Sequence, residues 1–499
     1  MDENLAGRAV SLWIATAGAT GYPPLTADVE VDVAVIGAGI AGLTTALALK
    51  RAGQRVAVLE AARVGTGVTG HTTGKVTSLH RLVYTELTRS HGAGTARVYG
   101  EANQAAVAHV ARVVAEEEIE CDFGRVANYT YAETDTTLPL VREEAELAAR
   151  LGLPAAFTTE VPLPFGVKGA VRFDGQAQLH AVKYLQGLAR AVHGGGSAVF
   201  EESFAQAFHD GSPAVVDTGM GSVRAREVVV ATNTPFGDQG AFGARCYPHR
   251  SYLVASRTEG QGPDGTFISV DEPMRSILSI DVDGWHYVLV GGEGHRVPAA
   301  GDTTERYRRL AAFSRDRLGT GDVAFRWSTQ DAMPVDGLPY VGRMSADVSH
   351  IFVITGLRKW GLTNGTAAAL MLTDILSGRR NEWASAFDST RPAPRSAPME
   401  SREGASGAEA AGGPKPGEGT VVDIAGEKTA VYVDPAGGVH ALSAVCTHLG
   451  CTVEFNAADL TWDCPCHGSR FAVDGAVIQG PATRNLAPRT EAGLHNPPA

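Results

Sequence analysis

The sequence predicts an α/β fold divided into two or three domains, since 499 residues are too many for one compact core. Three stretches indicate this organisation. Residues 31–60 read as strand, glycine turn, helix and strand, residues 391–419 are rich in Pro, Gly, Ser, Ala and Glu, and residues 446–469 bring four cysteines and two histidines together. We therefore expect a nucleotide-binding region, then a linker, then a small metal-binding domain.

The first region carries a Gly-x-Gly-x-x-Gly turn between an apolar strand and a helix. Gly37 permits the tight turn, Gly39 lets the backbone approach a pyrophosphate at the helix N-terminus, and Gly42 allows close helix packing. Glu60 ends the second strand, where its carboxylate is placed to hydrogen-bond an adenosine ribose. A lone glycine motif is often a chance cluster, but this strand context predicts a Rossmann-type dinucleotide site.

The rest of the chain is less regular. Residues 101–118 are alanine-rich and helical in pattern, and strand-like runs follow at 228–233, 287–290 and 351–354. Residues 391–419 cannot bury enough apolar surface to order themselves. The predicted boundaries are 1–30 for an N-terminal extension, 31–390 for the nucleotide-binding and interleaved substrate domains, 391–419 for a flexible linker and 420–499 for the C-terminal domain.

The C-terminal motifs are Cys-Thr-His-Leu-Gly-Cys at 446–451 and Cys-Pro-Cys-His-Gly-Ser at 464–469. Over residues 418–490 the chain resembles all-β Rieske [2Fe-2S] domains of the cytochrome bc type. The resemblance implies that two thiolates hold one iron and two imidazoles hold the other, which raises the potential above that of an all-cysteine cluster. The implied ligands are Cys446, His448, Cys464 and His467. A zinc site is the alternative, but its four ligands leave two cysteines without a role.

The same resemblance implies a disulfide between Cys451 and Cys466 and a shielding proline loop at residues 480–482. Disulfides are uncommon in reducing compartments, so a pair of thiols stays open as the alternative.

The hydrogen bonds to the cluster predict a low midpoint potential. Ser469 occupies the place of the hydroxyl that bonds a bridging sulfide, but Phe471 replaces the tyrosine that bonds a cysteine sulfur. Loss of a hydrogen bond to sulfur disfavours the reduced, more negative cluster. We therefore expect a midpoint potential below that of respiratory Rieske centres. Redox titration of the isolated C-terminal domain checks this, and a respiratory-like potential would contradict it.

Two late segments, 331–342 and 355–365, carry a second resemblance. With the nucleotide-binding start and Ala-Thr-Asn at 231–233, they resemble the FAD-dependent D-amino-acid oxidase and sarcosine oxidase superfamily over residues 30–390. The resemblance implies a glutathione-reductase-like FAD domain with an α+β substrate domain, and a flavin ring beside the second late segment. The whole chain is similar to bacterial FAD-dependent oxidoreductases that end in a Rieske domain. The expected cofactor-binding residues are Gly37, Gly39, Gly42, Glu60, Arg63, His71, Thr72, Thr73, Gly361, Leu362, Thr363 and Asn364.

His71 follows Glu60 by eleven residues, the offset at which dimethylglycine and sarcosine dehydrogenases carry a histidine joined covalently to FAD. The resemblance leaves two roles open for His71, an 8α-histidyl bond or a polar contact with the FAD phosphates or ribityl chain. Acid precipitation separates them, because a yellow supernatant over a colourless pellet excludes the bond.

The substrate is less well specified by the sequence. Related enzymes for glycine or D-amino acids place an arginine near the start of the first late segment to bind a carboxylate, whereas this chain has Asp331 there. Asp331 either faces the pocket, where it would receive an amine cation, or faces solvent. Other cations that could anchor an acid are Arg250, Arg296, Arg358 and Lys359. The sequence alone does not identify catalytic residues.

The composition excludes some partners. With 43 Lys and Arg against 55 Asp and Glu, the net charge of −12 argues against nucleic acid. No apolar run reaches the length of a membrane span, and no signal pattern opens the chain, so a cytoplasmic protein is expected.

We expect a dehydrogenase of a small amine or amino-acid-like substrate. Hydride would pass to flavin N5, and electrons would leave singly through the Rieske cluster to an external protein or quinone. The alternatives are the reverse direction, in which a donor reduces the cluster and then FAD for a reductive or oxygen-dependent reaction, and a non-enzymatic electron-transfer or redox-sensing module.

Overall fold

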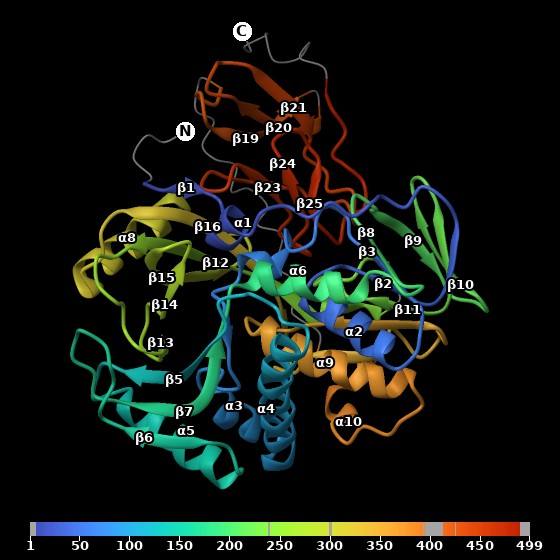
Figure 1. Ribbon diagram of the computed structural model, residues 1–499. Coiled ribbons are helices and arrows are strands. Elements are labelled where there is room, and N and C mark those ends of the chain that lie inside the picture. Colours follow the sequence, from blue (N-terminus) through green and yellow to red (C-terminus); the bar gives the residue numbers. More distant parts are fainter. Residues whose placement is uncertain are drawn as a thin grey trace.

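The computed structural model describes residues 6–237, 240–298, 302–392, 394, 413–424 and 426–489. Two large mixed sheets form the body of the molecule, and two small antiparallel sheets form the C-terminal domain (Figure 1). The predicted α/β fold class is confirmed. Of the predicted linker, residue 393 and residues 395–412 lie outside the described residues.

The nucleotide-binding sheet is parallel at its centre, because crossover connections return each strand in the same direction. Its strands, in spatial order, are β17 (Tyr340–Arg343), β18 (Ile351–Thr355), β11 (Ser222–Val230), β2 (Val29–Ile36), β3 (Val56–Leu59) and β8 (Ala198–Phe200). In addition, β10 (Ala214–Thr218) pairs with β11, and β9 (Ala205–His209) pairs with β10. The predicted apolar run at 351–354 falls on β18, and the run at 228–233 falls on β11 as far as residue 230. The carboxyl ends of β2, β11 and β18 meet at one edge, where open α/β sheets bind ligands.

The second sheet is mostly antiparallel and carries the substrate side of the molecule. Its order is β1 (Arg8–Ala9), β16 (Val323–Pro334), β12 (Cys246–Arg257), β15 (Trp285–Arg296), β14 (Arg275–Val282), β13 (Thr266–Ser269), β5 (Gly124–Ala132), β7 (Gly169–Gln178) and β4 (Lys75–Val76), with β6 (Ala155–Thr158) beside β7. Strand β1 pairs with β16 in parallel, so residues 8–9 of the predicted N-terminal extension belong to this sheet.

Helices cover both sheets. They are α1 (Leu12–Thr16), α2 (Ile40–Arg51), α3 (Val83–His91), α4 (Ala93–Glu116), α5 (Leu138–Arg150), α6 (Ala181–Val192), α7 (Phe242–Arg245), α8 (Thr304–Leu318), α9 (Gly361–Leu376) and α10 (Ala384–Phe387), with the 3-10 helix η1 (Val68–His71). The predicted helix at 101–118 is the main part of α4. Its buried positions recur every three or four residues, which is the spacing of one helix face. In the described residues no helix is long and apolar enough to cross a membrane.

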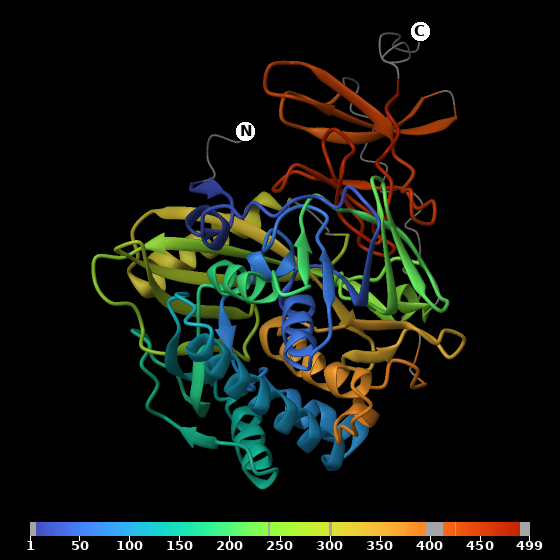
Figure 2. The same cartoon turned by 45° about the vertical axis from the view of Figure 1, so that its right-hand side comes forward.

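The C-terminal domain is all β. One sheet contains β19 (Gly419–Ile424), β20 (Glu427–Val433) and β21 (Val439–Ser443), and the other contains β22 (Glu454–Asn456), β23 (Thr461–Asp463), β24 (Arg470–Ala472) and β25 (Val477–Gln479). Trp462 and Phe471 are fully buried in its core. Figures 1 and 2 show the domain above the body of the molecule, and its residue Asp459 contacts Arg250 of β12 and Ser328 of β16.

Candidate active site and metal centre

The first feature of the site is the glycine turn between β2 and α2. Gly37 has φ +107°, and a Cβ there would lie 2.6 Å from the carbonyl oxygen of Ala231, which directly follows β11. Only glycine fits this position without strain. Gly39 caps α2 with extended backbone and lies on the wall of a cavity of about 620 Å³. The turn therefore presents the helix N-terminus to the cavity, as dinucleotide binding requires.

Glu60 completes this end of the cavity. Its Oε2 accepts a hydrogen bond from Ala38 N at 2.9 Å, and its Oε1 accepts one from Ala62 N at 3.1 Å. Burial raises the pKa of Glu60, and the two amides oppose that rise. The carboxylate is thus held at the strand end where an adenosine ribose would lie in a dinucleotide complex.

Eight of the twelve predicted cofactor residues line this cavity. They are Gly37, Gly39, Glu60, His71, Thr72, Thr73, Gly361 and Leu362. The last two open α9, so a second helix N-terminus meets the cavity. Two helix N-termini and a strand-end carboxylate fit a long, anionic dinucleotide.

The other four predicted residues lie off the cavity wall. Gly42 packs behind the turn, where a Cβ would lie 1.9 Å from Gly37 O. Arg63 donates to Thr20 O at 3.1 Å. Thr363 and Asn364 bond the surrounding fold, through Thr363 Oγ1 to Thr77 O at 2.9 Å and Asn364 Nδ2 to Tyr99 OH at 3.1 Å. These contacts support the walls, and direct contact between FAD and these four residues stays a prediction.

His71 ends η1 on the cavity wall. Its Nδ1 donates to Gly67 O at 2.9 Å, and burial lowers its pKa, so the neutral ring carries its lone pair on Nε2. A neutral ring with that lone pair suits both roles that the sequence left open.

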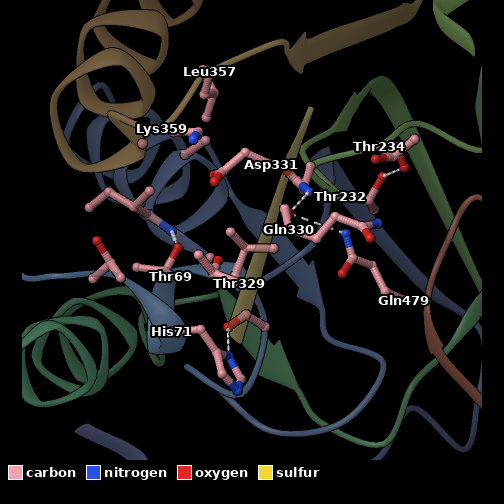
Figure 3. A pocket seen from close by; sticks show the side chains of 18 of the residues that line it. Thr69, His71, Thr232, Thr234, Thr329, Gln330, Asp331, Leu357, Lys359 and Gln479 are labelled. Atoms are coloured by element: carbon pink, nitrogen blue, oxygen red, sulfur yellow. Dashed lines mark hydrogen bonds between the residues drawn. The ribbon is translucent and has the colours of Figure 1, made fainter. Parts of the chain in front are cut away.

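Asp331 is buried and lines the cavity, which answers the question that the sequence left open. Figure 3 shows its carboxylate and the Lys359 amine pointing toward one another. Burial raises the pKa of Asp331 to about 7 and lowers that of Lys359 to about 8. Each group partly offsets the shift of the other by Coulomb attraction. The pair therefore titrates near neutral pH, where proton transfer at a substrate amine takes place.

His249 is a third member of this group that the sequence did not indicate. It lies opposite Asp331 in the β12–β16 register. A Cβ on Gly294 would lie 2.7 Å from His249 Cε1 and 3.1 Å from Lys359 Nζ, so the glycine leaves room for both side chains. Burial lowers the pKa of His249 to about 3, which keeps its ring neutral. No local motif marks His249, because only strand pairing brings it to the cavity.

The other cations named from the sequence have partners of their own, although Arg358 also lines the cavity. Arg250 pairs with Asp459 and Asp463 of the C-terminal domain, and Arg358 pairs with Glu86 at 3.0 Å. Exposed Arg296 stacks on the Tyr247 ring, 4.7 Å from its centroid. Lys359 is the cation of this group that points at Asp331.

The metal centre is built by the two loops of the C-terminal domain. Cys446 and Cys464 are both buried with free thiols, and the rings of His448 and His467 lie 4.9 Å apart at 87° with both Nδ1 atoms buried. Two thiols and two imidazoles therefore converge, as a [2Fe-2S] cluster of the Rieske type requires.

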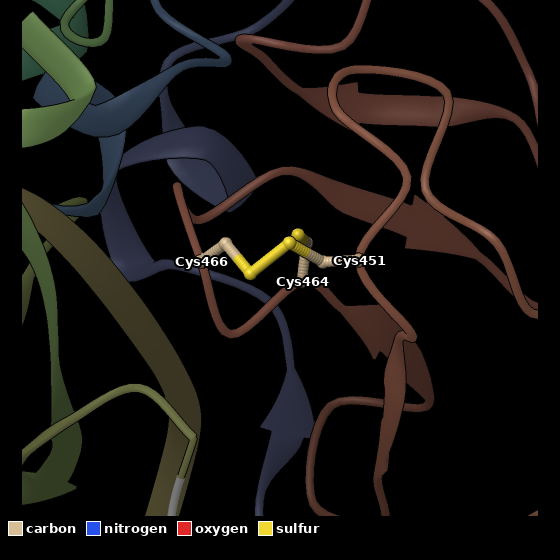
Figure 4. A group of neighbouring side chains, drawn as sticks. All are labelled: Cys451, Cys464 and Cys466. Atoms are coloured by element: carbon tan, nitrogen blue, oxygen red, sulfur yellow. A yellow bond between two sulfur atoms is a disulfide. The ribbon is translucent and has the colours of Figure 1, made fainter. Parts of the chain in front are cut away.

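Cys451 and Cys466 form a disulfide across the loops, with an S–S distance of 1.99 Å. Figure 4 shows Cys464 beside this disulfide. The three sulfurs lie within 4.8 Å of one another, but the bonded pair has no thiolate to offer a metal. Ser469 Oγ accepts from Ala482 N at 3.0 Å, which ties the proline loop to the second ligand loop.

Comparison with known proteins agrees with both sites. Residues 32–375 match the family described as FAD dependent oxidoreductase, and residues 410–490 match the Rieske [2Fe-2S] domain. The protein is thus a flavin-dependent oxidoreductase with an iron-sulfur domain, and it binds FAD and a Rieske [2Fe-2S] cluster. The chain belongs to the DAO family of FAD dependent oxidoreductases. Both the zinc site and the non-enzymatic module that the sequence left as alternatives are thereby set aside.

Relatives differ in how much of the chain they share. The chain is 33% identical to "Putative Rieske 2Fe-2S iron-sulfur protein YhfW" of Bacillus subtilis, over 95% of this chain and 96% of that protein. It is 26% identical to gamma-glutamylputrescine oxidoreductase of Escherichia coli, over 72% of this chain and 88% of that protein. The glycine oxidase structure from Geobacillus kaustophilus shares the fold, with a TM-score of 0.61 at 19% identity over 73% of this chain and 99% of that chain.

Proposed function

We propose that the protein is a dehydrogenase of a small amine or amino-acid-like substrate, whose electrons leave singly through the Rieske domain to an external acceptor. When bound, FAD supplies a two-electron acceptor and the cluster supplies a one-electron exit. A protein or a quinone is the proposed acceptor. The gamma-glutamylputrescine oxidoreductase of Escherichia coli, whose name states an amine-containing substrate, supports the substrate class.

One observation carries this proposal. The cavity that holds the glycine turn and His71 is also lined by residues 477–483 and Arg470 of the Rieske domain. Both domains therefore line the same cavity. This favours direct electron transfer between FAD and the cluster over two cofactors that react independently.

Three side chains of this protein border the proposed substrate position. Asp331 is positioned to hold an ammonium group or to take its proton, and the neutral ring of His249 and the amine of Lys359 border the same space. Hydride loss requires a neutral amine, so a carboxylate that accepts the ammonium proton favours the reactive form.

The experiment is an anaerobic screen of amines, N-methyl amino acids and hydroxy acids, read by flavin bleaching and then by loss of the oxidised-cluster absorbance. A substrate that bleaches the flavin first and the cluster second is expected. Cluster reduction that comes before flavin reduction with a reduced donor protein, and no bleaching by any substrate, would favour the reverse direction instead.

The pH dependence of flavin reduction tests the role of Asp331. Below its pKa of about 7 the Asp331 carboxyl is protonated and cannot accept a proton from the substrate. We therefore expect kcat/KM to rise as the pH increases from 6 through about 7 and then to level off. Asp331→Asn is expected to remove the rise near pH 7. A variant profile that keeps this rise would assign the titration to another group.

A further inference from the structure

The contact between the Rieske domain and the FAD domain centres on one buried arginine. Arg250, on β12, has a fully buried side chain. Its Nη1 lies 2.8 Å from Asp459 Oδ2, and its Nη2 lies 2.9 Å from Asp463 Oδ2. Both carboxylates belong to the Rieske domain and are themselves at most 11% exposed. Such ion pairs are stable only with complete partners, because a buried charge left alone is costly.

The charges balance only when the two domains are together. Within the Rieske domain, Arg470 lies 3.3 Å from Asp459 and 3.4 Å from Asp463, so this cluster alone carries one cation and two anions. Arg250 supplies the missing positive charge from the FAD domain. Undocking would separate Arg250 from both of its carboxylate partners and leave the Rieske domain with an excess carboxylate.

Uncharged side chains of the FAD domain add hydrogen bonds around this ion pair. Tyr307 OH and Ser328 Oγ of the FAD domain both donate to Asp459, the former at 3.1 Å. Thr303 Oγ1 donates to Asn456 Oδ1 at 3.0 Å and accepts from the amide of Ala458 at 3.1 Å. Several FAD-domain groups therefore bond the β22–β23 turn and its flanking residues at the same time. If the domain shifted along this surface, these hydrogen bonds could not all be kept.

The ligand loop of the cluster is fixed by the same surface. Gln330 Nε2 donates to Gly468 O at 2.6 Å, while Gln330 Oε1 accepts from Arg250 Nη2 at 2.8 Å. A Cβ on Gly243 of α7 would lie 2.4 Å from Cδ2 of the His467 ring. The imidazole of His467 thus packs directly on FAD-domain backbone. Gln330 immediately precedes Asp331 and also lines the cavity.

We propose that the Rieske domain works from one fixed position on its own chain, with Arg250 and Gln330 as positioning residues and His467 as the ligand that faces the FAD domain. This inference rests on the proposed function. The two electrons taken from each substrate pass this contact in two one-electron steps, and an external one-electron acceptor removes each of them. Electron transfer between the two cofactors then requires no movement of the domain.

A cross-link tests whether the domain is fixed. Thr303→Cys with Asn456→Cys places two thiols where the native side chains meet at 3.0 Å. Mild oxidation is expected to give an internally cross-linked monomer on a denaturing gel. A covalent dimer would mean that the domain docks on a neighbouring chain and would overturn the proposal.

The rate of electron transfer is then measured in the cross-linked holoprotein. FAD is reduced anaerobically with light and deazaflavin, so that no substrate is needed, and the cluster is followed by absorbance and electron paramagnetic resonance. The rate of cluster reduction in the cross-linked protein is expected to agree within about twofold with the rate after the engineered disulfide has been opened. A tenfold loss that returns on disulfide reduction would show that movement is required. Failure of transfer in the wild type would instead contradict the proposed function.

Arg250→Met removes the charge and keeps most of the side-chain volume. We expect cluster reduction at least tenfold slower than in wild type, with a changed cluster resonance spectrum. Arg250→Lys, which keeps the charge, is expected to recover part of the rate. Arg257→Met is the matched control, because Arg257 lies on the same strand but is exposed and contacts Trp285. Wild-type transfer and an unchanged spectrum in Arg250→Met would overturn the role of Arg250.

Discussion

Replacement of Gly42 by alanine is expected to weaken FAD binding by about 5- to 150-fold, which corresponds to the roughly 1–3 kcal/mol that overpacking costs. The added Cβ would lie 1.9 Å from Gly37 O and 3.2 Å from Val35 Cγ1. Helix α2 must therefore move away from the turn, and the backbone that faces the pyrophosphate moves with it. FAD content after gel filtration and fluorescence titration of the apoprotein measure the effect.

Gly94→Ala is the matched control for this change. Gly94 also lies in a helix, α4, but a Cβ there meets no atom within 4 Å. Alanine favours an exposed helix by up to about 1 kcal/mol, so wild-type FAD content and equal or higher stability are expected. Equal FAD affinity in Gly42→Ala and Gly94→Ala would show that the close approach at Gly42 does not shape the FAD site.

Asp331→Asn is expected to lower kcat/KM for an amine substrate by about 10- to 150-fold. The estimate follows from the roughly 1.5–3 kcal/mol that a hydrogen bond to a charged group contributes. The amide keeps the size of the side chain but neither balances an ammonium charge nor accepts its proton. Stopped-flow measurement of flavin bleaching at several pH values isolates this step from later electron transfer.

Exposed Asp322, near the start of the same strand, provides the control for Asp331. Asp322→Asn is expected to leave flavin bleaching within twofold of wild type. A normal rate in Asp331→Asn would remove Asp331 from the substrate site. An equal loss with substrates that lack an amine would show that its carboxylate serves the flavin rather than the substrate.

The local motifs were predictable because their geometry depends on short stretches of chain. The glycine turn, its strands and the helix at 101–118 appear where the sequence places them, and the two cysteine and histidine loops converge. The N-terminal residues were less predictable. Residues 8–9 pair with β16, more than 300 residues away, and no pattern within so short a strand indicates that partner.

The substrate end of the cavity depended on strand pairing. From the sequence, Asp331 had two equally open orientations, and His249 carried no signal. The β12–β16 register places them opposite each other, and Gly294 leaves the space that His249 and Lys359 share. A shift of one residue in that register would turn these side chains to the other face of the sheet.

The sequence by itself determined the two cofactors of this protein, because a glycine turn and the ligands of a metal cluster are sets of nearby residues with fixed spacing. Only the tertiary structure decided how the two halves meet. Arg250 was one of four candidate substrate anchors in the sequence, and its carboxylate partner Asp459 lies 209 residues further along the chain. Long-range ion pairs form where folding brings buried charges together, and no local spacing encodes that distance.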